Sequence, residues 1–223
     1  MSIAQETLAR DDPYRISLGG RSDTGQQRVV LAEGGPAAKR IISAYGFWIF
    51  LLSDIVMFSA FFAAYAVLSG ETAGGPSGKQ LFNMTSVALQ TGCLLLSSFA
   101  CGVASIGARA RKDFMYYGGM TATALLGAAF LLLELRDFTS MIAQGAGPTR
   151  SAFLSSFFAL VGCHGLHVTL GLLWLLTMMA QVFAKGYRAD IMRRVLCFAL
   201  FWHTLDIIWV GIFTVVYLMG VAV

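Results

Sequence analysis

Charged residues are scarce in this sequence. Asp, Glu, Lys and Arg make up 13% of its 223 residues, and 57% of the residues are hydrophobic. A soluble domain carries about 25% charged residues, so an ordinary soluble domain is excluded. The net charge of +4 does not indicate nucleic-acid binding, because the basic residues gather at the ends of apolar runs. We therefore expect a membrane protein that crosses the bilayer several times.

Motifs that bind metals or haem are also missing. The cysteines form no CxxC or CxxCH and lie inside apolar stretches, as small buried hydrophobes do: Cys93, Cys101, Cys163 and Cys197. The histidines are three, His164, His167 and His203. A di-haem cytochrome needs paired axial histidines, and a membrane di-iron enzyme needs more ligands. A zinc site from the three histidines stays an alternative, but we favour hydrogen bonds between helices or to lipid headgroups.

Long apolar runs supply the fold class. The runs cover about 41–68, 81–108, 114–136, 152–183 and 195–218, and each is long enough to cross a bilayer as a helix. The sequence therefore predicts an all-α, polytopic bundle of five transmembrane helices over 41–223. Residues 1–40 are polar, without a signal-peptide h-region or a sustained apolar period, so we expect an extended or disordered tail. The chain has no internal repeat, which makes an inverted-repeat transporter less expected.

Lys and Arg residues near the span ends sort to one side of the membrane. Nine lie on the side of the N-terminal tail and three on the opposite side. The nine are Lys39, Arg40, Arg109, Arg111, Lys112, Lys185, Arg188, Arg193 and Arg194. The three are Lys79, Arg136 and Arg150. Because cytoplasmic loops carry the excess of Lys and Arg, we expect a cytoplasmic N-terminal tail and a C-terminus on the other side.

Asp54 is the one ionisable residue in the middle of the first span. An acid at that depth costs roughly 2.5–3.5 kcal/mol on insertion scales, so it should not face lipid. At 100° per residue it shares an aromatic stripe, which we expect to pack on protein: Phe47, Phe50, Asp54, Phe58, Phe61 and Tyr65. An acid that changes charge inside a membrane is a candidate for proton handling. The alternative, of about equal weight, is an acid that only hydrogen-bonds a neighbouring helix.

Polar residues recur in the last two spans. His164 and His167 are three residues apart, so they lie on one side of the fourth helix. His203 and Asp206 lie on the fifth span and are too costly to face lipid. Because consecutive spans joined by a short loop pack antiparallel, we expect a histidine of the fourth span close to the fifth span, with Asp206 as its hydrogen-bond partner.

The third span ends in acidic residues. Glu134 and Asp137 can be interfacial residues, with Arg136 as a partner, and we favour that reading over a functional role by roughly two to one.

Three segments resemble subunit III of haem–copper terminal oxidases. They are FWIFLLSDIVMFSAFFAAYAVL, FFALVGCHGLHVTLGLLW and LFWHTLDIIWVGIFTVVYL, in the family's order. The HGLH and WHxxDxxW motifs are specific, and the likeness covers nearly all of the chain after about residue 40. Five spans rather than seven, with ELRDF and GPTRSAFLSSFFALVG, look most like subunit III of the bacterial cytochrome bo-type ubiquinol oxidase.

The resemblance implies an accessory, non-catalytic subunit of a quinol:oxygen oxidoreductase in a bacterial inner membrane, with a periplasmic C-terminus. It implies no haem, copper or quinone in this chain, since those centres lie in partner subunits. The family member packs on subunit I, together with subunits II and IV, binds phospholipids, and supports proton uptake and sustained turnover. A subunit of a cytochrome c or nitric oxide reductase system, or a free-standing proton-coupled transporter, remains the alternative.

The resemblance also assigns residues. The family's buried carboxylates fall on Asp54, where the family usually has Glu, and on Glu134, which raises the weight of a functional role for that residue. The HGLH histidines fall on His164 and His167. The WHxxDxxW pair falls on His203 and Asp206, as structural or lipid-contact residues.

Overall fold

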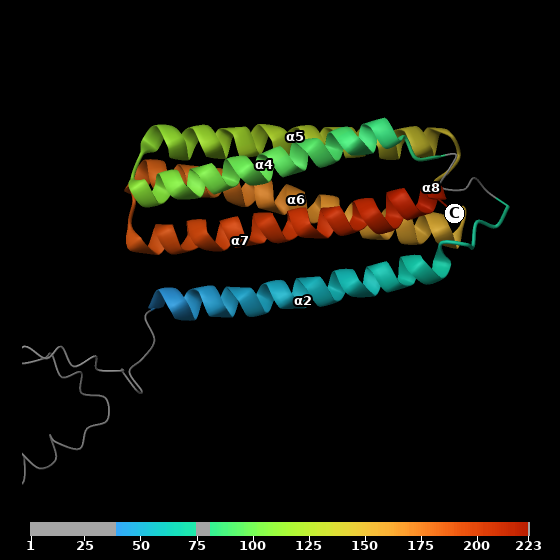
Figure 1. The fold of residues 1–223 in the computed structure, drawn as a ribbon, viewed down its shortest axis with the longest axis horizontal. Helices are drawn as coiled ribbons and strands as arrows, with labels where there is room; N and C mark the ends of the chain where they lie inside the picture. The colour runs from blue at the N-terminus through green and yellow to red at the C-terminus, as the bar shows by residue number, and fades with distance from the viewer. Residues whose placement is uncertain (1–38, 75–80, 223) are drawn as a thin grey trace, which may run out of the picture. The chain divides into compact units, whose positions relative to one another are not determined.

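The computed structural model describes residues 39–74 and 81–222, and these residues contain helices and no strand. In chain order the elements are α2 (Lys39–Leu68), α4 (Met84–Ala110), α5 (Asp113–Ala143), α6 (Ala152–Lys185), α7 (Ala189–Ile212), the π-helix η1 (Phe213–Leu218) and α8 (Met219–Ala222) (Figure 1). The described residues include five helices long and apolar enough to cross a membrane, the last formed by α7 with η1. The predicted fold class is confirmed. The tail at 1–38 lies outside the described residues.

Local capping chemistry sets the helix ends. Asn83 Oδ1 accepts hydrogen bonds from the backbone N–H groups of Thr85 and Ser86 at the start of α4. At the start of α6, Ser151 Oγ accepts from the N–H of Leu154 at 3.2 Å. The chain leaves α6 through Gly186, whose φ of 68° lies in the region that glycine adopts at no steric cost.

Helix α5 extends beyond the apolar run that predicts it. The run ends near residue 136, whereas the helix continues to Ala143. The extra two turns keep Arg136, Asp137 and Ser140 on a helical surface beside the start of α4. This extension creates the polar cavity described below.

Helices α4 and α5 make the closest approach in the bundle. A Cβ built on Gly119 of α5 would lie 2.8 Å from the Cβ of Ala104 and 2.8 Å from the carbonyl oxygen of Ala100 on α4. A Cβ on Gly107 would lie 2.7 Å from the Cβ of Met115. Small residues at a membrane helix interface permit such backbone contact, where packing replaces the hydrophobic effect.

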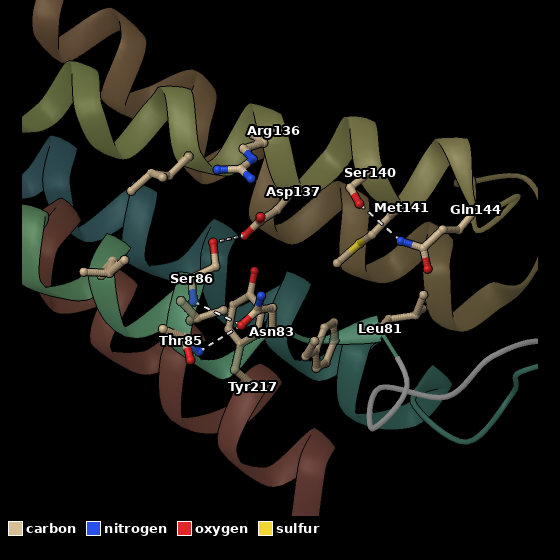
Figure 2. A pocket seen from close by; sticks show the side chains of 14 residues that line it. Leu81, Asn83, Thr85, Ser86, Arg136, Asp137, Ser140, Met141, Gln144 and Tyr217 are labelled. Atoms are coloured by element: carbon tan, nitrogen blue, oxygen red, sulfur yellow. Dashed lines mark hydrogen bonds between the residues drawn. The ribbon is translucent and has the colours of Figure 1, made fainter.

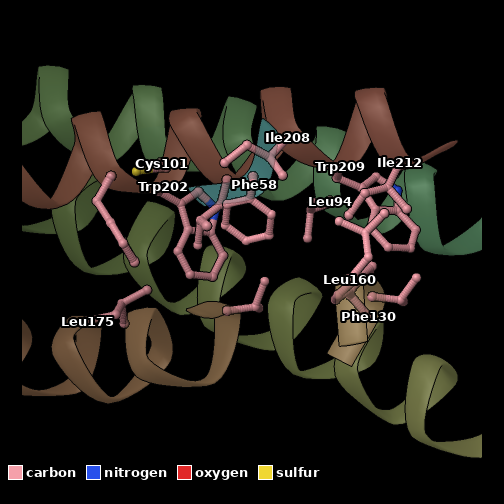
Figure 3. Packing of buried hydrophobic residues seen from close by; sticks show 14 of the residues in the cluster. Phe58, Leu94, Cys101, Phe130, Leu160, Leu175, Trp202, Ile208, Trp209 and Ile212 are labelled. Carbon is pink, nitrogen blue, oxygen red and sulfur yellow. The ribbon is translucent and has the colours of Figure 1, made fainter. Parts of the chain in front are cut away.

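Helix α7 is the most buried of the five long helices, and α2 is the least buried. Indole rings from α7 fill the centre of the bundle, where Trp209 meets Phe130 of α5 with ring centroids 4.6 Å apart (Figure 3). Trp202 fits against α6 and α5 because Gly171 and Gly127 leave room for its ring. The core therefore depends on large rings from α7 placed opposite glycines.

The inward face of α2 differs slightly from the predicted stripe. Phe50 is 51% exposed, whereas its neighbour Leu51 is 1% exposed. The buried residues Leu51, Phe58 and Tyr65 recur every seven positions, as they do when one narrow seam of a helix meets its neighbours. Asp54 lies beside this seam and is half-buried.

Candidate functional site

Glu134 is the most deeply buried acid of the described membrane helices. Its side chain on α5 is 4% exposed, and its carboxyl group lies against the backbone of α6. The contact exists because residue 165 is glycine: a Cβ there would lie 2.9 Å from Oε1 and 3.1 Å from Oε2. Neither oxygen has a hydrogen-bond partner among the described residues. Burying a charged carboxylate without a partner is costly, so this position favours the neutral, protonated form and makes Glu134 a candidate for proton handling.

His164 precedes Gly165 and lies in an aromatic cage. The imidazole is fully buried, with ring centroids 5.2 Å from Trp209, 5.8 Å from Phe130 and 6.3 Å from Phe58. Neither ring nitrogen has a partner among the described residues. The expected proximity of this histidine to the fifth span is present, but an indole provides the contact.

The polar residues of α7 face α4 instead of the fourth span. His203 Nδ1 and Ser98 Oγ are 2.6 Å apart, and the Asp206 carboxyl lies within interaction range of both groups. Trp202 Nε1 donates to Ser97 Oγ at 3.1 Å. The predicted pairing of Asp206 with a histidine of the HGLH motif is therefore wrong.

A third contact of the same kind lies further along both helices. Trp209 Nε1 donates to Thr91 Oγ1 at 3.1 Å. No role is assigned to Thr91, Ser97 and Ser98 of the second span from the sequence, so these hydrogen-bond partners were missed. The sequence did contain a signal. The spacing of Thr91, Ser97 and Ser98 on the second span is similar to the spacing of Trp202, His203 and Trp209 on the fifth span.

Asp54 belongs to a contact between α2 and α6. Asp54 is half-buried on α2. His167 of α6 is held by a 2.8 Å hydrogen bond between its Nδ1 and the carbonyl oxygen of Cys163. Phe58, one turn from Asp54, packs edge-on against His167 with centroids 5.3 Å apart. The structure thus brings Asp54 and His167 to one interface.

Asp137 has different partners from those expected. Its Oδ2 accepts hydrogen bonds of 2.8 Å from Ser86 Oγ and from Gln90 Nε2, both on α4. Adjacent residues on a helix point about 100° apart, so Arg136 cannot face Asp137. Among the described residues the ion pair is Arg188 with Asp190, and Arg136 stays exposed. The expected interfacial pair between Arg136 and Asp137 is therefore wrong.

Two cavities flank this acidic part of α5. One, of about 380 Å³, lies between the start of α4 and the end of α5, and Asp137, Arg136 and Tyr217 line it (Figure 2). The other, of about 300 Å³, lies between α5 and α6 and is apolar except for Glu134 and Thr169. Glu134 and Asp137, one turn apart, thus border different cavities.

The three histidines do not come together as one group of potential metal ligands in the described residues. The part of the chain that the structure describes includes all three, and it contains no group of three or more His, Cys, Asp or Glu residues placed to hold a metal ion. His203 faces α4, whereas His164 is enclosed by aromatic rings. The described geometry therefore does not support a zinc site formed by these three histidines.

Comparison with known proteins decides the family. The family model for cytochrome c oxidase subunit III matches residues 33–221. The chain belongs to this family. It is similar to the cytochrome bo(3) ubiquinol oxidase subunit 3 of Pseudomonas aeruginosa, with 51% identity over 80% of this chain and 85% of that protein.

Other members of the subunit III family are also similar. The quinol oxidase subunit 3 of Bacillus subtilis is 40% identical over 80% of this chain and 88% of its own length. The cytochrome c oxidase subunit 3 of Bacillus sp. PS3 is 43% identical over 78% of this chain and 84% of its own length. The predicted family is confirmed, and the chain is an accessory subunit III of a terminal oxidase complex, a multi-pass protein of a bacterial membrane.

Proposed function

We propose that this subunit III belongs to a quinol-oxidising, proton-pumping oxidase and packs on a haem-bearing subunit I, with subunits II and IV. The observation that carries the proposal is the 51% identity to a protein named ubiquinol oxidase subunit 3 across most of both chains. The haem and copper centres would lie in the partner subunits. The 43% identity to a cytochrome c oxidase subunit 3 supports a second candidate, in which cytochrome c is the electron donor.

Purification of the tagged chain from its membranes in mild detergent tests the proposal. We expect a stable complex whose reduced-minus-oxidised spectrum shows haem and which oxidises ubiquinol. Oxidation of reduced cytochrome c by the same complex would favour the second candidate. A tagged chain that purifies without any haem-bearing partner would contradict both proposals and favour a free-standing transporter.

We also propose that Asp54 and Glu134 handle protons in support of uptake by the catalytic subunit. Two features support this role: Asp54 lies half-buried at the contact of α2 with α6, and Glu134 lies buried with no hydrogen-bond partner among the described residues. Asp54→Asn and Glu134→Gln keep the side-chain shape and remove the titrating group. We expect assembly to be retained and the turnover lifetime to shorten.

The measurement is activity per assembled complex, followed over time and across about pH 6–9. Asp206→Asn is the matched control, because Asp206 faces α4 and is proposed as a structural residue. Wild-type activity and lifetime in Asp54→Asn at every pH would reduce Asp54 to a structural acid.

A further inference from the structure

A polar cluster on α4 and α7 lies at the centre of the membrane. Its members are Ser98 of α4 and His203 and Asp206 of α7. Ser98 is 14 residues from the start of α4 and 12 from its end, and His203 is 14 residues from the start of the last span and 15 from its end. At 1.5 Å per residue, both residues lie about 18–23 Å from either end of a helix that crosses the bilayer. The cluster is therefore far from both headgroup regions.

The bundle does not enclose this cluster. Ser98, His203 and Asp206 are each half-buried. Large apolar side chains beside them are exposed: Leu95 47%, Phe99 73%, Ile207 71% and Val210 43%. Because residues three or four positions apart lie on one side of a helix, these side chains surround the cluster. We call this surface, from residue 95 to 102 on α4 and from 203 to 210 on α7, the α4–α7 face.

The chain itself leaves polar atoms of the cluster without partners. His203 Nδ1 is 2.6 Å from Ser98 Oγ, and the second ring nitrogen, Nε2, has no hydrogen bond in the described part of the chain. The Oδ1 atom of Asp206 is buried and has no hydrogen-bond partner among the described residues. A carboxyl group at the centre of a bilayer is costly and seldom faces lipid. Acyl chains offer no hydrogen-bonding atoms at this depth, so the cover has to come from protein.

Space for a second helix is present beside the cluster. Gly102 lies one turn from Ser98 on α4, and a Cβ built on it would have no neighbouring heavy atom within 4 Å. Small residues on a membrane helix let the backbone of a partner helix approach closely. A helix that packs on Gly102 therefore comes within reach of the His203 and Asp206 side chains.

We propose that a transmembrane helix of another subunit of the oxidase packs on the α4–α7 face and brings a hydrogen-bonding side chain to His203 and Asp206 at the centre of the membrane. The inference rests on the proposed complex and names the surface of this chain that a partner covers. The exposed apolar residues supply the packing around the polar contact. The polar contact fixes which part of the partner helix lies there.

The side chain that the partner brings is uncharged. His203 and Asp206 are neutral as a pair when they share one proton, either as imidazole and carboxylic acid or as imidazolium and carboxylate. A charged partner would add an uncompensated charge at the centre of the bilayer, which is costly. A hydroxyl or amide group, as in Ser, Thr, Asn or Gln, both donates and accepts hydrogen bonds, so it suits the imidazole and the carboxyl group together.

A bulky side chain at Gly102 tests the surface. Gly102→Leu blocks the α4–α7 face, and its Cβ meets no atom of the chain. Gly118→Leu is the matched control, because Gly118 of α5 also has open space around it and lies outside this face. The tagged chains are purified in mild detergent, and the copurified subunits and haem are measured per tagged chain. We expect Gly102→Leu to lower both amounts about tenfold and Gly118→Leu to leave them unchanged, with the same helical circular dichroism in both chains.

Photocross-linking identifies the occupant in a complex that keeps Gly102. A benzophenone amino acid is placed at position 207, since Ile207 is 71% exposed on the α4–α7 face. We expect a cross-link to a transmembrane peptide of another subunit, and we expect that peptide to contain Ser, Thr, Asn or Gln. This measurement keeps the proposal testable if Gly102→Leu fails to fold.

Three outcomes would overturn the surface: wild-type amounts of partner with Gly102→Leu, equal losses with Gly102→Leu and Gly118→Leu, or cross-links from position 207 only to acyl chains or to a second copy of this chain. A cross-linked peptide without a hydroxyl or amide side chain would overturn the proposed chemistry. A wild-type chain that purifies without any other subunit contradicts the proposed complex itself. A wild-type complex that Gly102→Leu does not disturb contradicts only the α4–α7 face.

Discussion

Gly165→Ala is predicted to disturb the packing of α5 on α6 through one side chain. The added methyl group would lie 2.9 Å from Oε1 of Glu134, closer than a carbon and an oxygen can pack. Glu134 is 4% exposed, so the methyl group must push its carboxyl group away from α6 toward the adjoining cavity. The variant therefore forces either the side chain or the two helices apart.

The expected magnitude combines two opposing effects. Overpacking a filled interior costs about 1–3 kcal/mol. Replacing glycine by alanine inside a helix gains about 1 kcal/mol. The net loss of stability is therefore about 0–2 kcal/mol, too small to interpret from one variant. A double-mutant cycle with Glu134→Ala isolates the clash, because that background has no carboxyl group to meet the methyl.

In the Glu134→Ala background we expect Gly165→Ala to be neutral or stabilising, so the coupling energy should be about 1–3 kcal/mol. The assay is unfolding of the purified chain by denaturing detergent, followed by helical circular dichroism. Gly162→Ala is the matched control on the same helix, since its Cβ would lie in ordinary contact, 3.8 Å from Cε2 of the Phe138 ring. Equal effects of Gly165→Ala in both backgrounds would refute the contact between Glu134 and Gly165.

Three further predictions concern packing and topology. Gly119→Ala should destabilise the chain by about 1–3 kcal/mol and lower its yield, because its Cβ would lie 2.8 Å from the Cβ of Ala104; Gly118→Ala, with open space around it, is the control in the same unfolding assay. Thr91→Val should cost about 0.6–2 kcal/mol, because it removes the acceptor of the Trp209 Nε1 hydrogen bond and keeps the side-chain volume, and an unchanged unfolding midpoint would contradict this. Reporter fusions at the two ends of the chain should place the N-terminus in the cytoplasm and the C-terminus in the periplasm, and the opposite result would reject the orientation.

The number of spans could be predicted because a bilayer imposes a minimum apolar length on each helix. The apolar-length rule also placed the end of the third span too early. The rule gives the length of the apolar run, whereas the hydrogen-bonded helix can continue beyond that run. Helix α5 continues to Ala143 past Asp137, whose carboxylate accepts hydrogen bonds from Ser86 and Gln90 on α4. The predicted inward stripe of α2 included Phe50, whereas the buried residue is its neighbour Leu51. A rotation of 100° per residue predicts which side of a helix is apolar, but it does not predict which residues on that side contact the neighbouring helices.

The partners of the polar residues on α7 depend on tertiary arrangement, which chain order does not specify. The prediction that Asp206 pairs with a histidine of the fourth span assumed that the polar sides of consecutive helices contact each other. Helix α7 is central, and it meets α6 with its indole rings at Gly171 and meets α4 with its polar groups.

The register between α4 and α7 follows from those polar groups. Ser98 contacts His203 and Thr91 contacts Trp209, so seven residues on α4 match six on the antiparallel α7. At 1.5 Å per residue these separations are about 10 Å and about 9 Å, so both contacts form only in one alignment of the two helices. Each contact contributes about 0.6–2 kcal/mol in a membrane, which is small beside the packing of the whole interface. A slide by one turn would break every such contact together and bury the donors without partners. The polar residues of the fifth span therefore select the alignment of α7 more than they add to overall stability.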